Sequence, residues 1–274
     1  MSDNPEIGHS VTTGDIVTNY HDIGSGSPLL LLHGSGPGVS AWANWRLVID
    51  RLKDRYRIIA PDLAGFGYSQ VPEGIEYSRE RWLTQIVDLL DALELDSVDV
   101  VGNSFGGSMA LALTIGHPQR VRRQILMGSV GVPFKITDGL DEVWGYTPDP
   151  ARMGDLMRNT FAYNADMITD DMVQLRYEAS MRPGTREAYE SMFPAPRQRW
   201  VDAMSHDFAD IRAIEHTTLM VHGRDDKVIP LSTSLTLNEL IVDSRMHVFG
   251  RCGHWTQIEH TDAFCRVVDD FLSE

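Results

Sequence analysis

The chain has 274 residues, of which 42% are hydrophobic and 23% are charged, a balance typical of a globular protein with a substantial buried core. Its formal net charge of −15 argues against binding to nucleic acids or to anionic membrane surfaces. An anionic substrate would be repelled at long range, so a site for one must supply its own local cation.

No stretch of the sequence approaches the roughly 18 consecutive apolar residues that a membrane-spanning helix needs. Residues 1–10 are polar and acidic and lack the apolar core of a secretion signal, so we expect a cytoplasmic protein. Cys252 and Cys265 are then expected to be reduced thiols, and no Cys or His spacing indicates a metal site.

A β-hairpin is predicted near the start of the chain, because residues 10–24 alternate in polarity around Gly14-Asp15. Six short apolar runs predict buried strands, at residues 29–32, 57–60, 97–101, 124–127, 218–221 and 246–249. Amphipathic stretches between most of these runs predict helices, notably residues 79–93 and 262–272. The alternation predicts an α/β fold with a mostly parallel, eight-stranded sheet and helices on both faces.

One long segment interrupts this alternation. From about residue 134 to residue 207 there is no clear buried strand, but Met, Trp, Tyr and Arg residues recur at helical spacing and several prolines divide the segment. We predict a helical cap at 134–207, inserted into a core domain formed by residues 1–133 and 208–274. Open α/β sheets bind ligands at the carboxyl ends of their strands, so a cap over those ends would enclose a pocket.

The most specific motif is Gly102-Asn103-Ser104-Phe105-Gly106, a G-x-S-x-G sequence at the point where a strand turns into a helix. The β-branched run 97–101 precedes it, and the small, apolar run 107–116 follows it. This context predicts a nucleophile elbow that exposes the hydroxyl of Ser104 at the edge of the sheet. A glycine-rich turn with a solvated serine is the structural alternative, and the partners of Ser104 decide between them.

A serine nucleophile needs a histidine to accept its proton. His254 follows the last predicted strand and precedes the last helix, which fits the chain order Ser, Asp, His of this type of elbow. His260 is the second candidate, although we expect it to open the last helix. His247 falls within a predicted strand and is expected to be structural, while His222 ends a strand on the loop that carries the acid.

The acid is expected in the loop after residues 218–221, where two aspartates compete. The spacing Gly-x-x-Asp-x-x-x-Pro selects Asp226, whereas we expect Asp225 to bond the loop backbone. The loop at residues 128–131, which could have carried the acid instead, contains no carboxylate. Asp226 would orient the imidazole and stabilise its charged form.

An oxyanion hole requires two backbone N–H groups aimed at the developing negative charge. Phe105, directly after the nucleophile, is expected to supply one. The glycine-rich loop at residues 33–38 is expected to supply the other, from Ser35. A phosphate cradle is an alternative for such a loop, but it lacks the lysine of a P-loop, and His33 is expected to be structural.

These motifs resemble the meta-cleavage product hydrolases, a family of α/β-hydrolase fold enzymes that hydrolyse carbon–carbon bonds in bacterial aromatic degradation. The resemblance extends over nearly the whole chain, and its clearest segments are residues 33–38, 42–45, 102–107, 223–230 and 252–255. Residues 139–146 and 193–200 resemble the subgroup that acts on ring-fission products of monocyclic catechols. The resemblance implies hydrolysis of the C5–C6 bond of a 2-hydroxy-6-oxo-2,4-dienoate, with no metal or organic cofactor.

The resemblance also implies substrate-binding residues. Arg176 and Asn44 would hold the 2-oxo-carboxylate end of the substrate, and a planar guanidinium is well suited to grip a carboxylate with two hydrogen bonds. Asn103 and Trp255 would form pocket walls. The remaining expected lining residues are Gly34, Gly36, Met157, Phe161, Val228 and Ile229.

Two other functions stay open. A carboxylesterase could use the same triad, although an esterase for neutral esters needs no carboxylate clamp. A non-catalytic ligand-binding protein with this fold could also keep the three residues. The expected partner is a small-molecule dienoate rather than nucleic acid or membrane, and the resemblance implies a homo-oligomer.

Overall fold

The computed structural model describes residues 4–274, so residues 1–3 of the polar segment at the start of the chain lie outside the described residues. One eight-stranded sheet runs through the molecule in the order β1-β2-β4-β3-β5-β6-β7-β8. The pairs β1–β2 and β2–β4 are antiparallel and all other pairs are parallel, which confirms the predicted mostly parallel sheet. The strands are β1 (His9–Thr13), β2 (Ile16–Ile23), β3 (Ser27–Leu32), β4 (Tyr56–Pro61), β5 (Val98–Asn103), β6 (Val121–Met127), β7 (Thr218–Gly223) and β8 (Ser244–Phe249).

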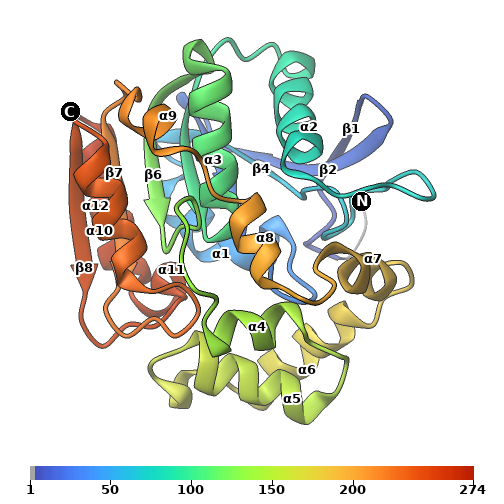
Figure 1. Cartoon of the computed structure of the whole chain (residues 1–274). Coiled ribbons are helices and arrows are strands. Elements are labelled where there is room, and N and C mark those ends of the chain that lie inside the picture. Colours follow the sequence, from blue (N-terminus) through green and yellow to red (C-terminus); the bar gives the residue numbers. More distant parts are fainter. Residues whose placement is uncertain (1–3) are drawn as a thin grey trace.

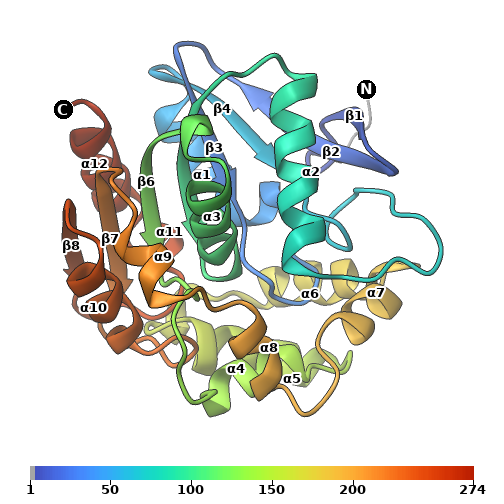
Figure 2. The ribbon, with the colours of Figure 1, turned by 45° about the horizontal axis from the view of Figure 1, so that its top comes forward.

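Helices cover both faces of this sheet (Figures 1 and 2). In β3, Leu29 and Leu31 pack with α1 (Ala41–Leu52) and α12 (Thr261–Leu272), while Leu30 and Leu32 belong to the apolar cluster of the opposite face. This alternation follows from the two-residue period of a strand and explains why the whole run is apolar. The opposite face carries α2 (Arg79–Ala92), α3 (Phe105–Gly116) and α10 (Leu231–Leu240).

The segment between β6 and β7 is helical in the structure and lies beside one end of the sheet (Figure 1). The division of the chain at residues 134 and 207 stays a prediction. The helices of this segment are α4 (Asp138–Trp144), α5 (Pro150–Asp155), a π-helical turn (Leu156–Phe161), α6 (Asp170–Ser180), α7 (Thr185–Met192), α8 (Gln198–Ala203) and α9 (Phe208–Arg212).

Short polar side chains fix where several of these helices begin. Thr137, Asp149 and Thr169 each accept a hydrogen bond from the backbone N–H three residues later, at the first turns of α4, α5 and α6. Such caps satisfy N–H groups that have no partner inside the helix, and each contributes about 1 kcal/mol. The π-helical turn that continues α5 has no counterpart in the predicted elements.

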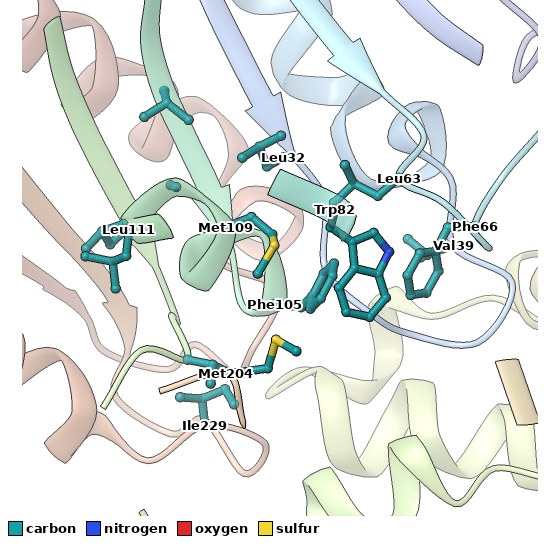
Figure 3. Close-up of a cluster of buried hydrophobic side chains, with 14 of the residues drawn as sticks. Leu32, Val39, Leu63, Phe66, Trp82, Phe105, Met109, Leu111, Met204 and Ile229 are labelled. Carbon is teal, nitrogen blue, oxygen red and sulfur yellow. The ribbon is translucent and has the colours of Figure 1, made fainter. Parts of the chain in front are cut away.

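The residue after the elbow serine is held by the apolar core (Figure 3). The ring of Phe105 is fully buried and packs edge-on against Trp82, with ring centroids 4.7 Å apart. Phe66 contacts the same ring, with centroids 5.8 Å apart. Edge-to-face aromatic pairs are both favourable and directional, so this cluster fixes the start of α3.

Among the described residues, no helix has both the length and the apolar character needed to cross a membrane. Cys252 and Cys265 are both buried and are not joined in a disulfide.

Candidate active site

Ser104 lies on a tight turn between β5 and α3, with φ 55° and ψ −115°. A side chain at Gly102 would meet the carbonyl oxygen of Gly106 at 2.3 Å, and one at Gly106 would meet the carbonyl oxygen of Leu32 at 2.3 Å. The two glycines therefore leave the space in which the backbone can turn so sharply. Ser104 itself adopts a backbone conformation that is seldom seen for residues other than glycine, and such strained conformations are common at functional sites.

The acid loop after β7 holds Asp226 against His254. One carboxylate oxygen, Oδ2, lies 2.7 Å from Nδ1 of His254, and the other, Oδ1, accepts the backbone N–H groups of Val228 and Ile229 at 2.7 and 2.9 Å. Burial acts to raise the pKa of Asp226, but the charge of His254 and hydrogen bonds from His222 and His254 hold this pKa well below its ordinary value. The carboxylate is thus ionised and fixed, as an orienting acid must be.

Asp225 takes a different place from the one we expected. Its side chain lies 3.4 Å from Arg224, and the carboxylate that bonds the loop backbone is that of Asp226. The prediction for Asp225 was therefore wrong. The turn directs Asp226 inward instead, where one carboxylate oxygen binds backbone N–H groups and the other binds the imidazole of His254.

His254 is held by the cap as well as by the acid. Its backbone N–H donates to the carbonyl oxygen of Phe161 at 2.7 Å, and the ring of Phe161 stacks on Trp255 with centroids 4.7 Å apart. His260 is turned away, since its Nε2 lies 3.2 Å from the carbonyl oxygen of Arg251.

Ser104 and His254 line the same pocket. Among residues 4–274, the hydrogen bonds join His254 to Asp226 and none joins Ser104 to His254. Catalytic hydrogen bonds are often long before substrate binds and tighten in the complex.

Two backbone N–H groups in this region have no partner among residues 4–274. In the part of the chain that the structure describes, neither the N–H of Ser35 nor that of Phe105 donates to a protein acceptor. Ser35 lines the pocket, and Phe105 directly follows Ser104. Unsatisfied N–H groups at buried positions are costly, and an oxyanion would satisfy both.

His33 at the start of the oxyanion loop is structural. Nδ1 lies 2.7 Å from the carbonyl oxygen of Gly34, and Nε2 accepts the N–H of Leu63 at 3.0 Å. Burial lowers the pKa of His33 to about 4, so the ring is neutral and ties two loops together.

Arg176 and Asn44 bring polar donors to the same pocket. Arg176 donates to the carbonyl oxygen of Gly38 at 3.2 Å, and within residues 4–274 it forms no ion pair. Burial lowers its pKa to about 10, which still leaves the guanidinium charged at neutral pH. The amide Nδ2 of Asn44 is buried with no hydrogen-bond partner. A charged guanidinium and an unpaired amide donor in one pocket are groups that can together bind an anion.

The pocket brings together most of the residues that we expected to bind substrate. Those that line it are Gly34, Gly36, Asn44, Asn103, Met157, Phe161, Arg176, Val228 and Trp255. Ile229 does not: its side chain is fully buried in the apolar core (Figure 3), and its contribution is the N–H bound to Asp226. The prediction for the Ile229 side chain was therefore wrong, because this side chain packs in the apolar core while that of Val228 lines the pocket.

Several lining residues were not predicted, namely Pro37, Val39, Ala43, Leu140, Val143, Met153 and Ile258. Leu140 and Val143 are three residues apart on α4, as are Trp255 and Ile258 at α11 (Thr256–Glu259), so helical spacing was the available signal.

The pocket is narrow, with about 30 Å³ of free space, and a neighbouring cavity of about 340 Å³ shares five of its residues. The shared residues are Ala43, Met157, Arg176, Trp255 and Ile258. The free space beside the nucleophile is thus much smaller than that of the neighbouring cavity, which offers room into which a bound ligand can extend. Within the described residues, no cluster of three or more His, Cys, Asp or Glu residues is arranged to hold a metal ion.

Comparison with known proteins places this arrangement in context. Residues 27–261 match the family model described as the alpha/beta hydrolase fold. The chain is 58% identical to a 2-hydroxy-6-oxo-2,4-heptadienoate hydrolase from Pseudomonas putida strain F1, over 98% of both chains. It is 56% identical to a 2-hydroxymuconate semialdehyde hydrolase from Pseudomonas sp. CF600, over 98% of this chain and 95% of that protein.

A solved structure is also very similar. It is that of a serine-to-alanine mutant of a meta-cleavage product hydrolase from Pseudomonas fluorescens IP01, complexed with acetates. The two structures align with a TM-score of 0.97 and 51% sequence identity, over 98% of this chain and 99% of that one.

Proposed function

Because this chain belongs to the α/β-hydrolase fold family, and within it to the meta-cleavage product hydrolases, we propose that it hydrolyses the C5–C6 bond of 2-hydroxy-6-oxo-2,4-dienoates. The products are 2-hydroxypenta-2,4-dienoate and a carboxylic acid. The names of the two similar hydrolases favour a hydrogen atom or a methyl group as the 6-substituent.

We assign the chemical steps to the pocket residues as follows. The bound dienoate gains a proton at C5 as its 2-hydroxyl group becomes a ketone, which creates an electron sink. Ser104 Oγ then attacks the C6 carbonyl while His254 takes the serine proton, and the oxyanion receives the N–H groups of Ser35 and Phe105. The C5–C6 bond breaks with its electron pair moving toward the ketone, and protonated His254 gives its proton to the resulting dienolate, which leaves as 2-hydroxypenta-2,4-dienoate.

Water activated by His254 would then release the carboxylic acid from Ser104, and Asp226 would stabilise the imidazolium in both halves of the reaction. A route in which water attacks C6 directly to form a gem-diol uses the same groups, with His254 as the base for water.

One observation carries the choice of substrate. The guanidinium of Arg176 forms no ion pair among residues 4–274, although Glu6 lies near enough to interact with its charge, and it shares the nucleophile's pocket with the unpaired amide of Asn44. A neutral ester offers nothing to these groups, whereas a 2-oxo-carboxylate can accept hydrogen bonds from both. This is the feature that favours a dienoate hydrolase over a carboxylesterase.

The test uses the coloured dienolates made by extradiol cleavage of catechol and of 3-methylcatechol. The purified protein should bleach their visible absorbance, and Ser104→Ala should abolish turnover. Ser108→Ala is the matched control, because Ser108 is a buried serine on the same helix whose hydroxyl donates to the carbonyl oxygen of Met204 at 2.6 Å. Turnover of nitrophenyl esters alone would indicate an esterase, and tight binding without turnover would indicate a ligand-binding protein.

We also propose that the enzyme acts in the cytoplasm as a homo-oligomer. β8 is an edge strand of the sheet, and Val248 on it, with Leu235 and Val242 nearby in the chain, exposes apolar surface. Edge strands with exposed apolar side chains are suited to pairing with a second copy. Sedimentation velocity would measure the assembly state, and a monomer at micromolar concentration would contradict this assignment.

A further inference from the structure

A second histidine lies against the acid of the triad. His222 is on β7 and is completely buried, and its Nε2 lies 3.4 Å from Oδ2 of Asp226 and 3.0 Å from the carbonyl oxygen of Ile229. Its other ring nitrogen, Nδ1, lies 2.7 Å from Oγ of Ser234 on α10. Ser234 is also completely buried. Neither His222 nor Ser234 lines the substrate pocket.

The partners of His222 determine where its proton sits. A carbonyl oxygen and an ionised carboxylate oxygen can only accept hydrogen bonds, so Nε2 must carry the hydrogen. Nδ1 is then an acceptor in the neutral ring, and the hydroxyl of Ser234 donates to it. The acceptor oxygens at Nε2 therefore select the tautomer of His222 that can donate toward Asp226, and the hydroxyl of Ser234 holds the ring in place.

We infer that His222, held by Ser234, is a positioning residue for the reaction that acts through Asp226. It shares Oδ2 of that carboxylate with His254, so the acid lies between two imidazoles. This inference rests on the triad of the proposed function.

The second imidazole adds a longer polar contact to the carboxylate, while the shorter hydrogen bond of its Nε2 goes to the carbonyl oxygen of Ile229. Oδ1 of Asp226 accepts two backbone N–H groups, and Oδ2 faces Nδ1 of His254 and Nε2 of His222. A carboxylate with donors on both oxygens cannot rotate, so the ring of His254 is aimed by a fixed partner. The donor from His222 also withdraws charge from Oδ2 and moderates how strongly Asp226 favours protonated His254.

This moderation has a measurable sign. Loss of the His222 contact leaves more negative charge on Oδ2, so the charged form of the triad imidazole is favoured. The acidic limb of the pH profile of kcat/KM should then move to higher pH. Other ionisable groups near this cluster are Asp225, Cys252 and Glu259, and the substitutions below leave all three in place.

The experiment compares His222→Leu, His222→Gln and Ser234→Ala in the full-length enzyme. We expect His222→Leu to lower kcat by roughly tenfold with KM within twofold, and to move the acidic limb upward by about half a pH unit. His222→Gln keeps an N–H donor near the Nε2 position and should restore most of kcat. Ser234→Ala should shift the limb in the same direction by a smaller amount.

The matched control is His206→Leu. His206 is another buried histidine near a serine, with Nε2 3.4 Å from Ser108 Oγ, but it is not in contact with the acid. It should lose comparable stability in urea and leave the acidic limb unmoved. An unmoved limb and unchanged kcat in folded His222→Leu would overturn the inference, as would an equal limb shift in His206→Leu.

Two further readouts keep the test informative. If circular dichroism shows that His222→Leu does not fold, Ser234→Ala becomes the test. An acidic limb of its kcat/KM profile that does not move would then overturn the inference. Each profile is also measured with a nitrophenyl ester, which uses the same triad. Failure of the wild-type enzyme to bleach the dienolate would reject the proposed function, while the ester profiles would still report on His222.

Discussion

The indole Nε1 of Trp144 in the cap donates a 2.9 Å hydrogen bond to Oγ of Ser35 in the oxyanion loop of the core. The hydroxyl of Tyr189, also in the cap, donates to the backbone carbonyl oxygen of Val143 at 2.6 Å and lies 3.1 Å from that of Ser35. The side chain and the carbonyl oxygen of Ser35 both contact residues of the helical segment between β6 and β7. This segment therefore helps to position the residue that we propose as an oxyanion donor.

Trp144→Phe should therefore impair catalysis while leaving the apolar packing of the ring nearly intact. A lost neutral hydrogen bond of this kind is worth about 1 kcal/mol, so we expect kcat to fall by roughly fivefold. Steady-state kinetics with the dienolate measure the effect. Trp200→Phe is the control, because Trp200 is a cap tryptophan that donates to Pro194 at 2.8 Å away from the pocket. Equal losses in the two variants would contradict the role of Ser35.

The two neighbouring aspartates should differ sharply in effect. Asp226→Asn removes the ionised partner of His254 and disturbs its tautomer, so kcat should fall on the order of 10³- to 10⁴-fold. Asp225→Asn, whose carboxylate only lies near Arg224, should retain kcat within about threefold. The pair is measured with the same dienolate preparation, and the reverse order of effects would move the acid to Asp225.

Arg176→Gln should separate anionic from neutral substrates. Loss of a buried charged hydrogen-bond donor costs about 3 kcal/mol, so kcat/KM for the dienolate should fall by roughly 100-fold. Turnover of a neutral nitrophenyl ester should change by less than about threefold. Arg186→Gln is the control, since Arg186 lies at the surface of α7 and pairs with Glu190 at 2.9 Å. Equal losses on both substrates would remove the carboxylate clamp.

Gly38 joins the oxyanion loop to the cap through close backbone contact. It has φ +65°, and a side chain there would lie 2.7 Å from the backbone nitrogen of Ser180 on α6. Gly38→Ala should lower the free energy of unfolding by about 3–5 kcal/mol, through both the strained conformation and the clash. Gly184→Ala is the control, because Gly184 has φ +80° but nothing within 4 Å, so it should lose only about 1–2 kcal/mol. Urea unfolding measures both, and equal losses would exclude the clash.

Two buried histidines should make the fold sensitive to mild acid. Burial lowers the pKa of His33 and of His206 to about 4, below the ordinary value of 6.5. Between these values the unfolded chain binds more protons than the folded one, so stability is complete above about pH 6.5 and falls as the pH drops toward 4. Each histidine contributes up to about 3 kcal/mol.

Asp62 opposes part of this trend, since burial raises its pKa to about 6 and the folded state then binds its proton more readily. We expect the free energy of unfolding in urea to be lower at pH 5 than at pH 7.5, and His206→Gln to reduce the difference. A wild-type protein that is equally stable at the two pH values would contradict this expectation.

The strands could be predicted from sequence because burial on both faces makes them continuous apolar runs. The run Leu29 to Leu32 is the clearest case, since its side chains alternate between the two apolar clusters on opposite faces of the sheet, and all four are buried. The strand ends could not be read in this way: β6 begins at Val121, three residues before the apolar run, because the backbone of Val121 already pairs with Val98 of β5.

The chain positions of the elbow serine, the acid and the histidine followed from local motifs at the ends of strands. Contacts between distant segments could not be read in this way. Nothing near Ser35 in the sequence indicates Trp144, which is 109 residues away, and nothing near Asp226 shows that the buried His222 turns its ring back toward it. Such pairs depend on how the cap and the loops settle in three dimensions.

The hydrogen bond from the His254 backbone to the carbonyl oxygen of Phe161 has a consequence for protein engineering. Exchange of the helical insert between related hydrolases, intended to alter substrate choice, would also replace Phe161, whose carbonyl oxygen holds the backbone of His254. A chimera should therefore transplant residues 252–255 together with the helical insert, and one that omits them should form product slowly whatever the fit of its new chamber.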